Sequence, residues 1–240
     1  MELNGKVGII TGATSGIGHA TAELLSAAGM KLVLTGRRAK ALEDLLKKLP
    51  GESAAVDGDI CDPNLPGVLI DTAKQRFGRL DFVFNNAGVM NIGTVEQVDD
   101  EAMASMIAVN YEAAVRMAYA ALRVFKKQGS GNLVNTSSIL GTKVRAGVGV
   151  YAGTKYAIEA MSEALRMEMA GTGVRVMVIE PGYTATELQS HWTKQQKEPL
   201  KAVARPVQPI DIARAVKFML EQPDHVLIPR LLMTPADQPM

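Results

Sequence analysis

The sequence KVGIITGATSGIG, at residues 6–18, passes from a short apolar run straight into a glycine-rich turn. Residues 6–11 predict a buried strand, and the amphipathic segment 16–29 after the turn predicts a helix. Glycines at 12, 16 and 18 let backbone N–H groups approach a ligand closely, and the helix N-terminus adds partial positive charge. A phosphate-bearing ligand is the natural occupant. The G-x3-G-x-G spacing differs from the general dinucleotide fingerprint, so an ordinary tight turn is the alternative.

The same alternation of apolar run and amphipathic segment continues along the chain. Further apolar runs, which predict buried strands, lie at residues 31–36, 54–56, 80–84, 131–136, 174–179 and near 226–233. Segments with helical periodicity lie at residues 38–49, 65–77, 100–127, 151–170 and 209–220. Apolar strands alternating with helices indicate a Rossmann-type α/β fold, a doubly wound parallel sheet of about seven strands with helices on both faces.

Length and composition favour a single domain over residues 1–240. The chain is 47% apolar, enough to bury a large core, which excludes a disordered or fibrous protein. With 26 Lys and Arg against 25 Asp and Glu, no overall field would recruit nucleic acid or an anionic membrane. Residues 183–208 are long for a connection inside a compact domain, and we expect them to form a substrate lid.

Cysteine content and the lack of targeting signals favour a soluble, cytoplasmic protein. The single cysteine, Cys61, cannot form an internal disulfide, and no Cys/His cluster has the spacing of metal ligands, so no metal is expected. Residues 2–6 lack the start of a signal peptide, and no uncharged apolar run approaches the roughly 20 residues that span a bilayer.

The end of the second predicted strand indicates which nucleotide the chain would bind. A site selective for NAD would offer Asp or Glu there to the ribose 2′-hydroxyl, but Gly36 stands at that place and Arg37 and Arg38 follow it. Guanidinium groups suit the dianionic 2′-phosphate of NADP in charge and in geometry. The alternative is that both arginines open the next helix in solvent, where they would oppose its dipole.

A second group of polar residues follows later strands. The segment NNAG at 85–88 closes the fourth strand, Asn110 lies in a long helix, and Ser138 follows the fifth strand. Tyr151 and Lys155, in YAGTK, are four residues apart and share one helix face. A free tyrosine has a pKa near 10, and a nearby ammonium favours the phenolate, which suits proton transfer. The alternative is that Tyr151 and Lys155 simply lie on an exposed helix turn and have no chemical role.

Taken together, these residues resemble the short-chain dehydrogenases/reductases in their compact single-domain form. TGATSGIG, NNAG, Asn110, Ser138, YAGTK and PGYTAT at 181–186 occur in the order of that family, and the likeness runs from about residue 6 to residue 233. The resemblance implies that Tyr151 exchanges a proton with the substrate oxygen and that Ser138 hydrogen-bonds this oxygen. Lys155 would bind the nicotinamide ribose and lower the pKa of Tyr151, and Asn110 would hold a proton-relaying water.

The resemblance also implies a set of NADP(H)-binding residues. Asp59 and Ile60 would contact adenine, and residues 181–186 would clasp the nicotinamide carboxamide. The full implied set is Gly12, Ser15, Gly16, Ile17, Gly18, Arg37, Arg38, Asp59, Ile60, Asn86, Ala87, Gly88, Tyr151, Lys155, Pro181, Gly182, Thr184 and Thr186.

The leading functional hypothesis is an NADP(H)-dependent oxidoreductase that moves hydride between nicotinamide and a carbonyl or secondary alcohol. Residues 211–233 resemble a subgroup that oxidises serine, 3-hydroxy acids and related alcohols with NADP, which favours a small hydroxy or oxo acid. Cationic side chains that could meet a carboxylate are Lys143, Arg145, His191, Lys194 and Lys197. The alternatives are a reductase of bulkier neutral ketones or aldehydes resting on Trp192, a non-redox member of the fold, and a nucleotide-sensing module.

The two longest predicted helices, 100–127 and 151–170, are apolar around much of their circumference. One apolar face can pack on the sheet, but a second needs another surface. We therefore expect a homo-oligomer, a tetramer or at least a dimer, and the family resemblance implies the same.

Overall fold

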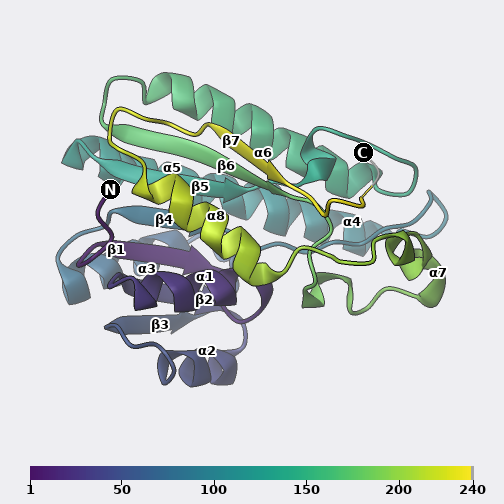
Figure 1. The fold of residues 1–240 in the computed structure, drawn as a ribbon, viewed down its shortest axis with the longest axis horizontal. Coiled ribbons are helices and arrows are strands. Elements are labelled where there is room, and N and C mark those ends of the chain that lie inside the picture. The colour runs from purple at the N-terminus through teal and green to yellow at the C-terminus, as the bar shows by residue number, and fades with distance from the viewer. Residues whose placement is uncertain (239–240) are drawn as a thin grey trace.

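The computed structural model describes residues 1–238 and contains one seven-stranded parallel sheet in the order β3-β2-β1-β4-β5-β6-β7 (Figure 1). The chain builds outward from β1 to β3 and then returns to pair β4 with β1. The strand order therefore reverses between β1 and β4, and the chain leaves these two neighbouring strands toward opposite faces of the sheet. Parallel sheets bind ligands at such a switch point, at the carboxyl ends of the strands. The strands are β1 Val7–Thr11, β2 Lys31–Gly36, β3 Ser53–Asp57, β4 Phe82–Asn85, β5 Gly131–Thr136, β6 Val174–Pro181 and β7 Arg230–Met233.

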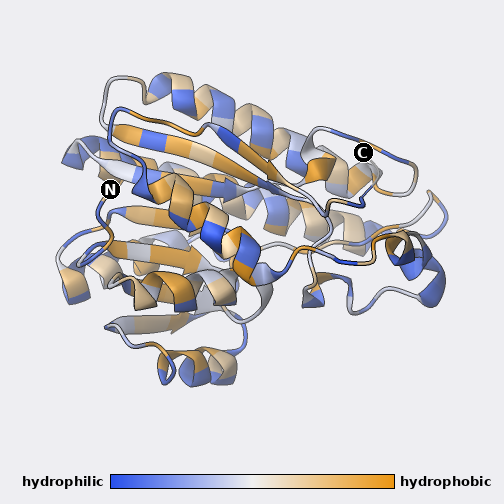
Figure 2. Ribbon diagram, in the orientation of Figure 1, coloured by the Kyte–Doolittle hydropathy of each residue, from blue (hydrophilic) through white to orange (hydrophobic). Residues whose placement is uncertain are grey.

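Helices cover both faces of the sheet, as the apolar strands predict. Side chains of α1, α2 and α8 pack on one face, and side chains of α3, α5 and α6 pack on the other. The apolar colour of the inner strands in Figure 2 follows from this double burial. The α-helices are α1 Gly16–Ala27, α2 Ala39–Leu46, α3 Leu65–Phe77, α4 Asp100–Ile107, α5 Ala113–Gln128, α6 Gly149–Glu168, α7 Lys194–Lys197 and α8 Pro209–Glu221.

Two predicted elements differ from the structure. The expected helix over 100–127 is interrupted by a π-helical turn at Ala108–Glu112, which contains the buried Asn110. The last strand is shorter than the expected 226–233, because Pro229 has no N–H for the ladder and its carbonyl accepts from Val178 and Arg166. The π-helical turn depends on contacts distant in sequence, whereas the missing N–H of Pro229 is a local feature of the sequence.

Residues 183–208 form a compact segment that connects the carboxyl end of β6 to α8. The backbone N–H groups of Ala185 and Val207 pair with the carbonyls of Val207 and Tyr183, so the two ends of the segment are joined. Between them lie the short helices η3 (Glu187–Gln189), α7 and η4 (Glu198–Ala202). Within residues 1–238, no helix has both the length and the apolarity that a membrane crossing requires.

Candidate active site

The loops after β1 and β4 are held together at the switch point by Thr11. Its hydroxyl oxygen accepts hydrogen bonds from the backbone N–H groups of Asn86 and Ala87, at 2.9 and 3.0 Å. The Asn86 amide in turn donates to the Thr11 carbonyl at 3.0 Å. The glycine-rich turn and the NNAG segment therefore form one rigid wall.

The glycine-rich turn has both the shape and the open donors that an anion requires. Gly12 has a φ of +68°, and a Cβ there would lie 2.9 Å from the Cα of Ala87. A Cβ on Gly18 would lie 2.3 Å from the Gly12 carbonyl oxygen, so Gly18 lets α1 pack against the turn. The N-terminus of α1 has no side-chain cap and no acidic residue in its first turn, which leaves its N–H groups available to a phosphate.

One cavity of about 1050 Å³ extends from this turn across the carboxyl ends of the strands. This volume is at the upper limit of single-ligand pockets and leaves room for a cofactor beside a substrate. Gly18 and Asn110 are absent from its lining, because Gly18 packs inside the turn and Asn110 is buried behind the wall. The predicted residues that line it are Gly12, Ser15, Gly16, Ile17, Arg37, Arg38, Asp59, Ile60, Asn86, Ala87, Gly88, Ser138, Tyr151, Lys155, Pro181, Gly182, Thr184 and Thr186.

Ser138, Tyr151 and Lys155 all line the cavity, and each is less than a tenth exposed. The Lys155 ammonium donates to the Thr136 carbonyl at 2.8 Å and lies 5.7 Å from the centre of the Tyr151 ring. The Ser138 hydroxyl accepts from the Leu140 N–H at 3.1 Å, which fixes its position at the end of β5. The i, i+4 spacing on α6 thus brings Tyr151 and Lys155 to one place, as the sequence predicts.

Burial dominates the proton affinities of this cluster. It raises the pKa of Tyr151 to about 12, with the Ser138 hydroxyl acting in the opposite direction. Burial also lowers the pKa of Lys155 to about 8, against the effect of the Glu159 carboxylate one helix turn away. Both shifts disfavour the charged forms, because a side chain removed from water loses the hydration of its charge.

Asn110 connects the NNAG loop to α6. Its Oδ1 accepts from the Val89 N–H at 2.8 Å, while its Nδ2 donates to the Val89 carbonyl at 2.8 Å and to the Thr154 hydroxyl at 3.3 Å. A Cβ on Gly88 would lie 3.3 Å from Asn110 Oδ1 and 3.9 Å from Lys155 Nζ. The π-helical turn therefore aims this amide at the loop beside Lys155.

The other end of the cavity holds the arginines that follow β2. Arg38 donates to the Thr14 hydroxyl and carbonyl and forms an ion pair with Glu187 at 3.1 Å. A Cβ on Gly36 would lie 2.7 Å from Thr14 Cγ2. The absence of a side chain at residue 36 is thus required by packing, in addition to the cofactor preference that the sequence suggested.

The segment 183–208 is docked against the loop after β4. Trp192 Nε1 donates to the Met90 carbonyl at 3.2 Å, and Gln196 Nε2 donates to the Ile92 carbonyl at 2.7 Å. His191 Nε2 lies 3.1 Å from Asn91 Oδ1. These contacts cover an apolar cluster of buried residues that includes Tyr151: Met90, Met106, Val148, Tyr151, Ala152 and Trp192.

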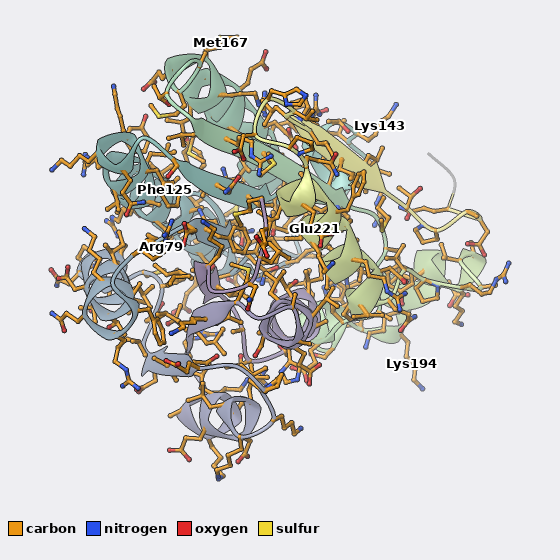
Figure 3. The ribbon with its side chains drawn as sticks, turned by 60° about the vertical axis from the view of Figure 1, so that its left-hand side comes forward. Arg79, Phe125, Lys143, Met167, Lys194 and Glu221 are labelled. Atoms are coloured by element: carbon orange, nitrogen blue, oxygen red, sulfur yellow. The ribbon has the colours of Figure 1, made fainter. Side chains whose placement is uncertain are left out.

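The cations proposed to meet a substrate carboxylate separate into two groups. Lys143, Arg145 and His191 line the cavity. Lys194 and Lys197 do not line it in this structure: Lys194 projects away from the body of the protein (Figure 3), and Lys197 donates to the Ser190 carbonyl at 3.0 Å.

Several residues of the site were not predicted from the sequence. Thr11 and Thr14 hold the loop wall and Arg38, and both belong to the glycine-rich stretch, whose hydroxyl residues were a usable signal. Glu187 directly follows the PGYTAT segment. The Gln238 side-chain oxygen accepts from the Tyr183 N–H at 2.8 Å and lines the cavity, but a residue in the tail offers no sequence signal for such a contact.

Comparison with known proteins agrees with this geometry. The family model described as short chain dehydrogenase matches residues 6–197. An uncharacterised oxidoreductase of Staphylococcus saprophyticus is 36% identical over 242 residues, covering 99% of this chain and 98% of that protein.

Two solved structures with nicotinamide nucleotides are similar over nearly the whole chain. A closed form of serine dehydrogenase complexed with NADP⁺ has a TM-score of 0.90 and 27% identity, covering 98% of this chain and 96% of the other. A 3-ketoacyl-(acyl-carrier-protein) reductase from Brucella melitensis complexed with NADH has a TM-score of 0.87 and 26% identity, covering 96% and 97%. The chain belongs to the short-chain dehydrogenase family and is an oxidoreductase of that family.

Proposed function

We propose that this protein transfers hydride between NADP(H) and a carbonyl or secondary alcohol carbon. The observation that carries the proposal is the convergence of Ser138, Tyr151 and Lys155 in a cavity that continues to an uncapped helix N-terminus. The nucleotide fits the residues present, since a Cβ at Gly12 would fill the cradle and the donors of α1 are open. When bound, NADP(H) supplies or accepts the hydride at the nicotinamide C4.

The proton side of the reaction belongs to the protein. Tyr151 Oη donates a proton to the substrate oxygen in reduction and accepts it in oxidation, while the Ser138 hydroxyl hydrogen-bonds the same oxygen and orients it. Lys155 Nζ lies 5.7 Å from the centre of the Tyr151 ring, and a positive charge at this position favours the phenolate form of Tyr151. Asn110 supports the arrangement by fixing the Val89 backbone next to Lys155.

The preference for NADP over NAD rests on the end of β2. Gly36 carries no carboxylate that would repel a 2′-phosphate, and Arg37 and Arg38 both line the cavity there. Asp59 and Ile60 line the adjoining wall and suit the adenine ring. The preference is tested by measuring kcat/KM for NADPH and NADH with one substrate, and a preference for NADH would overturn it.

For the substrate, we propose a small hydroxy or oxo acid. Lys143, Arg145 and His191 line the cavity, and a carboxylate would find charge-assisted donors there once residues 183–208 act as a lid that excludes water. The test is Arg145→Ala, which should reduce kcat/KM for acids while leaving that for neutral ketones nearly unchanged.

A bulkier neutral ketone or aldehyde is the second candidate substrate class. The observation in its favour is the apolar wall that Met90, Leu140, Leu188, Trp192 and Leu200 contribute to the same cavity. If neutral ketones are turned over at least a hundredfold better than any hydroxy or oxo acid, this second class is correct.

We also propose a homotetramer, with a dimer as the alternative. Exposed apolar side chains lie on the helical face built from α4, α5 and α6, namely Ile107, Tyr119, Tyr156 and Met167, which are 41–69% exposed. Met167 lies at the outer boundary of the molecule in Figure 3. Burial of such side chains in a subunit contact would remove apolar surface from water. Light scattering at micromolar concentration tests the proposal, and a monomer mass would refute it.

The broad assignment is tested by one assay of the purified protein. NADPH or NADP⁺ is incubated with a panel of ketones, aldehydes, oxo acids and hydroxy acids while the absorbance of the reduced nicotinamide is followed. Turnover of one class with NADP(H) supports the assignment. Absence of turnover across all classes, with intact nucleotide binding, would favour a sensing module instead.

A further inference from the structure

The Arg38 guanidinium has several hydrogen-bond partners within the protein itself. Its Nε donates to the Thr14 hydroxyl at 3.3 Å, and its Nη2 donates to the Thr14 carbonyl and hydroxyl at 3.1 and 3.2 Å. Its Nη1 donates to Glu187 Oε2 at 3.1 Å. All three guanidinium nitrogens therefore have partners, and one of these partners is an anion.

The ion pair joins two walls of the nucleotide end of the cavity. Arg38 lies in the loop between β2 and α2, immediately before α2. Glu187 is the first residue of η3, near the start of segment 183–208. Both residues line the cavity. Next to Glu187, the Thr186 side chain faces Gly16, where a Cβ would lie 3.1 Å from Thr186 Cγ2. The Glu187 carboxylate thus places a negative charge on the arginine that is expected to meet the 2′-phosphate.

We propose that Glu187 is a specificity-determining residue that weakens selection of NADP(H) over NAD(H) by competing with the 2′-phosphate for Arg38. The inference rests on the proposed function, because it requires Arg38 to face the 2′-phosphate. A nucleotide with this phosphate must either share Arg38 with the Glu187 carboxylate or displace the carboxylate from it. A nucleotide without the phosphate leaves the ion pair intact. The effect of Glu187 is therefore expected on NADP(H) alone.

The expected effect of Glu187 on the Kd of NADP(H) follows from the solvent exposure of the Arg38–Glu187 ion pair. The Arg38 and Glu187 side chains are 51% and 65% exposed, so solvent screens their attraction and a dianionic phosphate can displace the carboxylate. An exposed pair of this kind shifts an equilibrium by up to about fivefold. Glu187 is expected to reduce the preference for NADP(H) without abolishing binding.

The test is Glu187→Gln, which removes the charge and keeps the shape and a hydrogen-bond acceptor for Arg38. We expect the Kd of NADPH, measured by fluorescence titration without substrate, to fall about three- to fivefold while the Kd of NADH is unchanged. The matched control is Glu198→Gln, which removes an equally exposed carboxylate in the same segment, one paired with Lys201. We expect the control to change neither Kd.

A double-mutant cycle shows whether Glu187 acts through Arg38. In an Arg38→Ala background, we expect Glu187→Gln to lose most of its effect on the Kd of NADPH. A full effect in that background would contradict competition for Arg38, and equal tightening of NADH and NADPH would contradict a role in specificity.

Failure of this inference differs from failure of the proposed cofactor. If Arg38→Ala weakens NADPH binding but Glu187→Gln changes nothing, the proposed function stands and Glu187 is not a determinant. If Arg38→Ala leaves NADPH binding unchanged and the native protein prefers NADH, the proposed cofactor itself is wrong.

Discussion

Asn110→Ala removes a side chain that is 1% exposed and joins the loop after β4 to α6. Its three hydrogen bonds, two to the Val89 backbone and one to the Thr154 hydroxyl, disappear together. At about 0.5–1.5 kcal/mol for each net hydrogen bond, the free energy of unfolding should fall by about 2–4 kcal/mol.

Urea denaturation followed by circular dichroism measures this loss. The urea concentration at the midpoint of unfolding should fall, while the dependence of the free energy of unfolding on urea concentration stays the same. Asn64→Ala is the control, since the Asn64 side chain is exposed and bonds only to Asp62 two residues away, and its cost should stay below about 0.5 kcal/mol. A loss below about 0.5 kcal/mol for Asn110→Ala would refute the view that this amide holds the loop in place.

The other predictions concern the glycine-rich turn and the pair formed by Tyr151 and Lys155. Gly18→Ala should weaken NADPH binding at least tenfold in a fluorescence titration, because a Cβ 2.3 Å from the Gly12 carbonyl must displace the turn; unchanged affinity would contradict this packing. Lys155→Met should lower kcat and raise KM for the nucleotide. It should also move the rise of kcat/KM for alcohol oxidation to higher pH, since loss of a positive charge raises the pKa of the Tyr151 phenol. An unchanged pH profile would contradict the electrostatic role of Lys155.

The sheet and the core of the site were predictable from local patterns. Apolar runs without polar alternation identify doubly covered parallel strands, and the i, i+4 spacing of Tyr151 and Lys155 places both on one face of α6. The position of TGATSGIG directly after β1 puts the glycine-rich turn at the switch point. These features depend on neighbours in sequence, so the sequence alone carries them.

Features that depend on distant contacts were not predictable. The π-helical turn at Asn110 is stabilised by the loop after β4, 21 residues earlier, and the engagement of Arg38 depends on Glu187, 149 residues later. The packing of Gly36 against Thr14 is of the same kind. It changes how the cofactor preference should be tested, because Gly36→Asp would disturb Thr14 and with it the hydrogen bonds that hold Arg38. Substitution of Arg37 avoids this problem, because it leaves Gly36 and the hydrogen bonds between Arg38 and Thr14 in place.

The most direct test of the central claim is turnover by Tyr151→Phe with NADPH and the best substrate of the panel. The variant keeps the aromatic ring in its buried place and removes only the hydroxyl that would exchange a proton with the substrate oxygen. We predict that the Kd of NADPH stays nearly unchanged while kcat falls by about a hundredfold or more, the range that general acid–base catalysis contributes. Retention of more than about a tenth of the native kcat would contradict the assignment of Tyr151 as the proton-transfer residue.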